Sequence, residues 1–94
     1  MAITKATGAV LGNYPRGSNN VVVGDGALDS LDASSPGGNN TAIGNNALTA
    51  NTTGGTNVAV GSGALDANTT ADDNVAVGYN AMTSNTSGEN NVGV

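Results

Sequence analysis

Few side chains in this sequence can do chemistry, and their types exclude most enzyme mechanisms. The 94 residues include no cysteine and no histidine, so a thiolate nucleophile, a disulfide and the usual zinc ligand sets are excluded. The adjacent acids Asp72 and Asp73 lack a partner acid fixed across a cleft, which glycoside hydrolysis would need. We interpret this pair as part of a solvated turn. The sequence therefore predicts no enzyme activity, no metal site and no cofactor.

Charge and hydropathy exclude further classes of function. The formal net charge is −5, and both basic residues, Lys5 and Arg16, precede the region of repeats described below. Nucleic-acid binding is not expected, because it requires a basic surface that displaces counterions from phosphates. No run of apolar residues approaches the roughly 18 needed to span a membrane, so no membrane insertion is expected. Neither a Gly-Lys-Ser/Thr phosphate loop nor a calcium-binding Gly-Gly-x-Gly-x-Asp repeat is present.

The apolar inventory cannot build a conventional globular core. Apolar residues make up 37% of the chain, but they are mostly Ala and Val, with no Phe and no Trp. The fifteen glycines and the 10% of charged residues would by themselves suggest disorder, since little bulk is available to offset ordering entropy. Regular internal repetition overturns that interpretation.

A five-residue pattern, Asn-x-small-Val/Ile-Gly, recurs along the chain. Its copies begin at Asn40, Asn57 and Asn74, which are 17 residues apart. An earlier copy begins at Asn20, three residues further away than this period, and a partial copy begins at Asn91. A second block of Ala-Leu or Ala-Met follows in each copy, and three copies then continue into Asn-Thr-Thr or Asn-Thr-Ser. The extra three residues of the first connection are predicted to fall within residues 31–38.

The repeat predicts short strands separated by bends. Val58 and Val60 alternate with a small residue, which is the period-two pattern of a strand. The glycine that closes each copy is predicted to adopt a positive φ or to lie close to neighbouring backbone. Two residues later Gly and Asn alternate between copies, which predicts a second bend in the left-handed region. The four positions of this second bend are Gly26, Asn46, Gly63 and Asn80.

Stacking one repeat on the next would place equivalent residues in ladders about 4.8 Å apart. We predict that the Val/Ile column forms a dry spine and that the Asn column forms an amide ladder. The position after Leu or Met agrees with stacking, because it alternates between Asp and Thr, so like charges do not meet on neighbouring repeats there. These residues are Asp29, Thr49, Asp66 and Thr83.

Residues 57–65, Asn-Val-Ala-Val-Gly-Ser-Gly-Ala-Leu, and their copies resemble the head repeats of trimeric autotransporter adhesins and the related repeats of bacteriophage tail fibres. The resemblance extends over residues 20–94. It implies a parallel β-roll in which three chains pack side by side with the Val/Ile strands near the shared axis. The 17-residue period is longer than that of autotransporter heads, and no stalk or membrane anchor is present, so the phage-type fibre is favoured.

The predicted fold is all-β, a parallel β-solenoid (β-roll) of about four 17-residue coils assembled as a trimer. Residues 1–19 are expected to form an N-terminal cap or attachment segment, and residues 20–94 the solenoid. The predicted function is a structural segment of a virion tail fibre or an extracellular surface adhesin. Such a segment could contact a host-surface glycan or protein.

Two alternatives stay open. The chain stops after Val94, where the repeat predicts Gly, so the subunit could be completed by a neighbour in a self-polymerising, head-to-tail filament. A monomeric ice-binding or ligand-binding solenoid is the second alternative, suggested by the Thr columns. Four Asn-x-Ser/Thr sequons, at Asn39, Asn51, Asn68 and Asn85, are interpreted as structural turns that the repeat supplies.

Overall fold

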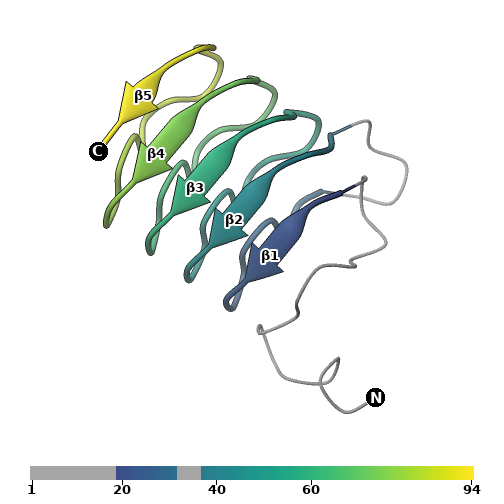
Figure 1. The fold of residues 1–94 in the computed structure, drawn as a ribbon, viewed down its shortest axis with the longest axis vertical. Helices are drawn as coiled ribbons and strands as arrows, with labels where there is room; N and C mark the ends of the chain where they lie inside the picture. Colours follow the sequence, from purple (N-terminus) through teal and green to yellow (C-terminus); the bar gives the residue numbers. More distant parts are fainter. Residues whose placement is uncertain (1–18, 32–36) are drawn as a thin grey trace.

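The chain forms one parallel β-sheet. The structure, a computed structural model, describes residues 19–31 and 37–94. Its five strands lie in the sheet in the order of the sequence (Figure 1), and no helix occurs in the described residues. The strands are β1 (Val21–Val23), β2 (Thr41–Ile43), β3 (Val58–Val60), β4 (Val75–Val77) and β5 (Val92–Gly93). The all-β prediction is thus confirmed, and the spacing of about 17 residues is consistent with a parallel repeat. Apart from Asn19, the predicted cap lies outside the described residues.

Equivalent residues of successive repeats lie side by side, as the repeat predicts. Ala42 pairs with Ala59 and Ala59 with Ala76, so the strands are in register. Backbone hydrogen bonds also join the repeats away from the sheet; the Leu48 N–H donates to the Ala64 carbonyl at 2.9 Å, and the Thr52 N–H to the Thr69 carbonyl at 2.9 Å. Each repeat is therefore a coil of chain stacked on the next (Figure 1), and we refer to residues 20–39, 40–56, 57–73 and 74–90 as coils 1 to 4.

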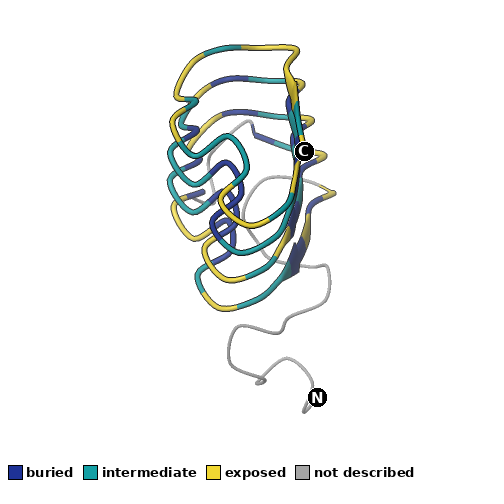
Figure 2. Ribbon diagram, turned by 90° about the vertical axis from the view of Figure 1, so that its left-hand side faces the viewer, coloured by how far each residue is buried: buried dark blue, intermediate teal, exposed yellow. Residues whose placement is uncertain are grey.

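The middle residue of each of the strands β1 to β4 points into the molecule. Ala42, Ala59 and Ala76 are fully buried, whereas the Val and Ile residues on either side of them are half-buried or exposed. Figure 2 shows the sheet nearly edge-on, with the rest of each described coil on one side of it. In a single chain the Val/Ile column is therefore not a dry spine, and its burial near an axis shared by three chains stays a prediction. The narrow space between the sheet and the opposite wall holds only the middle residue of each strand, which is Ala in β2 to β4 and Val22 in β1, so the flanking β-branched residues face outward.

The second block of the repeat supplies the bulk of the core. Leu48 and Leu65 are fully buried, together with the alanines that precede them. Both leucines have a positive φ, 53° for Leu48 and 52° for Leu65, which bulky residues rarely adopt. This strained conformation is stabilised by burial of the isobutyl group and by backbone hydrogen bonds between coils. A change to negative φ would expose the largest side chains of the core.

The glycine after each strand has the predicted positive φ. Gly44, Gly61 and Gly78 have φ between 129° and 131°. A Cβ added to Gly61 would lie 2.5 Å from the carbonyl oxygen of Gly78, so the coils can approach only because this side chain is absent.

A Gly61→Ala substitution is expected to lower the free energy of unfolding by about 3 kcal/mol, because it combines an unfavourable φ with a clash against backbone. Gly78→Ala is the matched control: its φ is the same 131°, but the nearest atom to an added Cβ is 3.9 Å away. Chemical denaturation of both variants measures the difference. Equal losses would show that conformation alone, not contact between coils, requires glycine here.

The second bend explains why Gly and Asn alternate. Gly26, Asn46, Gly63 and Asn80 all have positive φ, between 54° and 76°, which confirms the predicted left-handed bend. A Cβ on Gly26 would collide with the Asn46 amide, and one on Gly63 with the Asn80 amide. Each Asn side chain thus covers a glycine of the preceding coil.

The longer first connection has little effect on stacking. Leu31, which is fully buried, precedes the equivalent position of the next coil, Asn51, by 20 residues. Gly37 lies beneath its equivalent, Gly54, and precedes it by the normal 17 residues. The three extra residues therefore fall between Leu31 and Gly37, inside the predicted interval. Residues 32–36 lie outside the described part of the chain.

Candidate interaction surface

The structure gathers no catalytic group of side chains in the part of the chain that it describes. Asp72 and Asp73 lie at a bend, as predicted, and both carboxylates bind the preceding coil. Asp72 Oδ1 accepts from the Gly55 N–H at 2.7 Å, and Asp73 Oδ1 accepts from the Thr56 hydroxyl at 2.6 Å. Over residues 19–31 and 37–94, no three acidic, histidine or cysteine residues are grouped so as to hold a metal ion.

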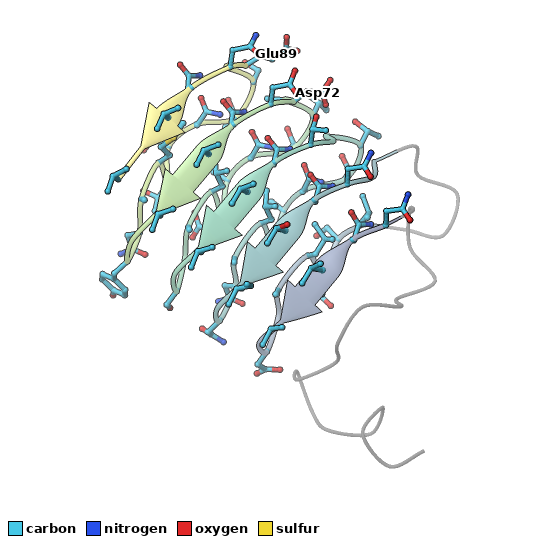
Figure 3. All side chains as sticks on the ribbon, viewed as in Figure 1. Asp72 and Glu89 are labelled. Atoms are coloured by element: carbon cyan, nitrogen blue, oxygen red, sulfur yellow. The ribbon has the colours of Figure 1, made fainter. Side chains whose placement is uncertain are left out.

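The described surface carries only negative charge. Figure 3 shows Glu89 next to Asp72 on the neighbouring coil, at the equivalent position of the repeat. Two carboxylates therefore lie at equivalent positions of neighbouring coils here. At the position after Leu or Met, the alternation of Asp and Thr avoids such a pair of like charges. No Lys or Arg lies in residues 19–31 or 37–94, so no side chain of the described residues carries a positive charge.

Within the described residues, the outward side of the sheet is an extended surface without charged side chains. We call it the lateral face and define it by the outward residues of the strands. It contains one Thr, and every other residue is apolar and β-branched. The members are Val21, Val23, Thr41, Ile43, Val58, Val60, Val75, Val77 and Val92.

The lateral face is flat, uncharged and accessible. Val21 is 42% exposed, Ile43 36% and Val77 40%, which leaves much apolar area in contact with water. All described coils lie behind the sheet, so no described segment covers this side (Figure 2). A contiguous apolar strip of β-branched side chains on the outside of a sheet is typical of an interaction surface.

A ladder of asparagines begins each coil and makes the interior rigid. Each side-chain oxygen accepts from the backbone N–H of the next Asn in the ladder; for Asn57 Oδ1 and the Asn74 N–H the distance is 3.0 Å. The amide nitrogens of Asn40, Asn57 and Asn74 donate across the interior, as Asn57 Nδ2 does to the Ala71 carbonyl at 2.9 Å. The ladder contains Asn20, Asn40, Asn57, Asn74 and Asn91. The predicted Asn column is thus confirmed, but its bonds join side-chain oxygens to backbone N–H groups, not amide to amide.

A second asparagine ladder, not foreseen as such, shares acceptors with the first. Asn68 Nδ2 donates to Asn51 Oδ1 at 3.1 Å, and Asn85 Nδ2 to Asn68 Oδ1 at 3.1 Å. Asn68 Nδ2 also lies 3.1 Å from the same Ala71 carbonyl that accepts from Asn57. No buried polar side-chain atom in the described residues lacks a hydrogen-bond partner.

This second ladder decides the role of two of the four sequons. Asn51 and Asn68 are fully buried and their amides are hydrogen-bonded, so a glycan on either nitrogen would displace the ladder. The structural interpretation of these sequons is confirmed, whereas Asn39 is exposed.

The threonines after the second ladder lie at bends, as predicted. The hydroxyls of Thr52 and Thr69 donate to carbonyls of the next coil, at 3.1 Å and 3.4 Å. They therefore belong to the stacking contacts and are not free to order water as donors.

Comparison with known proteins yields no match: no protein family, curated protein or solved structure is similar to this chain. In the described residues no helix is long and apolar enough to cross a membrane. The interpretation of function therefore depends on the chain itself.

Proposed function

We propose that the chain is a structural fibre segment: a parallel β-solenoid that assembles as a trimer through its lateral face. The observation that carries the proposal is the exposed apolar strip along the sheet, because outside it the large exposed apolar residues of the described chain are only Tyr79 and Val94. Burying that strip would remove Val21, Ile43 and Val77 from water, and hydrophobic burial is the main driving force of association.

The interior fits a load-bearing role better than a catalytic one. The first asparagine ladder joins every coil to the next and the second joins coils 2 to 4, through hydrogen bonds such as Asn40 to Asn57 and Asn51 to Asn68. Each additional coil extends the sheet by one strand spacing of about 4.8 Å. The number of coils would therefore set the length of a rigid rod.

The surface favours a second copy of this chain as the partner. Identical faces share the same strand spacing, so the ridges of one can fit the grooves of another, and the faces carry no charge that would oppose contact. The strip is three residues wide, about 10 Å by the rise per residue. Three chains around an axis let each narrow strip touch two neighbours, which buries more of it than a pair would.

The proposed location is a virion tail fibre or another extracellular surface, and the support for it is the resemblance of residues 20–94 to fibre repeats. In such a fibre the tip or the outer sides of the trimer would contact a host-surface glycan or protein. An ice-binding function has less support, because the Thr52 and Thr69 hydroxyls donate within the chain.

Light scattering on a sizing column tests the proposal directly. A trimer has three times the 9.0 kDa mass of one chain. Large heterogeneous species would instead favour the head-to-tail filament, and the mass of a single chain would overturn assembly altogether.

Salt is expected to strengthen the assembly. The described surface holds six carboxylates, Asp25, Asp29, Asp66, Asp72, Asp73 and Glu89, and no base, so the copies repel one another at long range. Raising ionic strength shortens the screening length from about 30 Å at 0.01 M to about 8 Å at 0.15 M. The dissociation constant should therefore fall with added salt, measured by sedimentation at several concentrations. A rise would indicate ion pairs across the interface, contrary to an apolar contact.

A further inference from the structure

Repetition creates a problem of register for any lateral assembly. On β1, β3 and β4 the lateral face presents the same pair of residues, two valines. A copy shifted along the axis by one coil would therefore keep most apolar contacts. A fibre of defined length needs some feature of the face that distinguishes one coil from the next.

The only strand among β1 to β4 that departs from this pattern is β2. It has Thr41 where its neighbours in the sheet have Val21 and Val58, and Ile43 where they have Val23 and Val60. Thr41 is half-buried, and its hydroxyl has no hydrogen-bond partner within residues 19–31 and 37–94. One polar group and one larger side chain thus mark a single level of an otherwise uniform strip.

We propose that Thr41, together with Ile43, sets the register between copies of this chain. The inference rests on the proposed lateral assembly. When copies are aligned, their Thr41 hydroxyls meet at one level and can hydrogen-bond to one another. When one copy is shifted by a coil, each hydroxyl faces the methyl groups of Val21 or Val58 and is buried without a partner, which is costly. Ile43 adds a steric constraint, because its extra methylene packs without overlap only against the same coil of the partner chain.

A single polar residue can play this role at little cost to the fold. A lone buried Asn in a coiled coil fixes the register and the number of strands while lowering stability. Thr41 has the shape of Val with one methyl replaced by a hydroxyl, so it preserves the packing of the strip. The proposal predicts that removing the hydroxyl strengthens association and weakens its specificity.

The test uses a Thr41→Val/Ile43→Val double variant of the full chain. It makes β2 identical to β3 and β4, so the coils are expected to fold as before, which circular dichroism checks. We expect light scattering to change from one trimer mass to a broad distribution of larger, staggered assemblies, because a shifted contact no longer closes a ring. Thr53→Val is the control, since Thr53 is exposed at a bend away from the face.

Cross-linking measures the register itself. The chain has no cysteine, so Val60→Cys and Val77→Cys introduce unique thiols on β3 and β4. Chains carrying Val60→Cys are mixed with chains carrying Val77→Cys, and the disulfide-linked 60–77 product is compared with the level-matched 60–60 product. In the Thr41→Val/Ile43→Val background the ratio of the 60–77 product to the 60–60 product should rise. The rise should be about tenfold for each Thr41 hydroxyl that a shifted contact would otherwise bury without a partner.

The two proposals fail in different ways. If the native chain has the mass of one molecule, lateral assembly and the register key are both overturned. If the native chain is a trimer and the double variant keeps both its mass and its ratio of cross-linked products, the fibre proposal stands and the register inference is overturned.

Discussion

A Val60→Asp substitution is expected to separate the assembly into single chains that remain folded. Val60 lies on the lateral face of the middle strand, β3, and its side chain points away from the buried Ala59. In a single chain the carboxylate would lie in water, and the cost is limited to a strand propensity of about 1 kcal/mol. In the assembly it would be buried against apolar neighbours, at an effective cost of several kcal/mol per charge. The dissociation constant should rise by at least about a hundredfold.

The control for this variant adds the same charge elsewhere. Thr70→Asp lies at an exposed bend outside the lateral face, so it should leave the mass unchanged. Light scattering and circular dichroism of both variants separate dissociation from unfolding. If Val60→Asp unfolded the chain at low concentration, the valine would contribute to the core of the single chain, contrary to the structure.

The repeat predicted most of the backbone conformation, because glycine and asparagine at fixed positions of a repeat indicate bends with positive φ. A glycine recurs every 17 residues directly after a three-residue strand pattern, which predicted a bend there. Gly44, Gly61 and Gly78 do have positive φ. The in-register stacking followed from the same periodicity, since coils of equal length bring Asn40, Asn57 and Asn74 into one column.

Which side of the strand faces inward could not be read from residue type. Val is more hydrophobic than Ala, and a strand of Val-Ala-Val normally buries its larger residues. Here the space behind the sheet decides, because Leu48 and Leu65 already occupy it together with the middle residues of the strands, which are Ala in β2 to β4 and Val22 in β1. The last strand supports this view: Gly93 replaces the alanine, and a Cβ there would lie 2.7 Å from the sulfur of Met82.

The left-handed leucines were also beyond sequence reasoning. Leucine has no intrinsic preference for positive φ, and its place in an Ala-Leu block suggested an ordinary apolar contact. Leu28, Leu48, Leu65 and Met82 all adopt φ of 51° to 55°. The signal was present only in the repetition itself, since one bulky apolar residue recurred in a chain otherwise rich in small ones.

An Asn57→Ala substitution should cause one of the largest losses of stability available in this chain. The side chain of Asn57 is fully buried, and it both donates to the Ala71 carbonyl at 2.9 Å and accepts from the Asn74 N–H at 3.0 Å. Alanine would leave the Asn74 N–H buried without a partner and open a cavity beside it. We expect the free energy of unfolding to fall by about 2–4 kcal/mol, measured by urea denaturation.

The comparison that interprets this loss is Asn45→Ala, in the turn after β2. Asn45 also donates to a carbonyl of the preceding coil, that of Asp25 at 2.9 Å, but this bond is exposed to water. Water can replace it, so the loss should be no more than about 0.5 kcal/mol. Equal losses for the two variants would mean that the number of hydrogen bonds between coils matters and their burial does not. A much larger loss for Asn57→Ala would identify the buried ladder as the element that makes the coils unfold together, because each of its asparagines completes the hydrogen bonds of two coils.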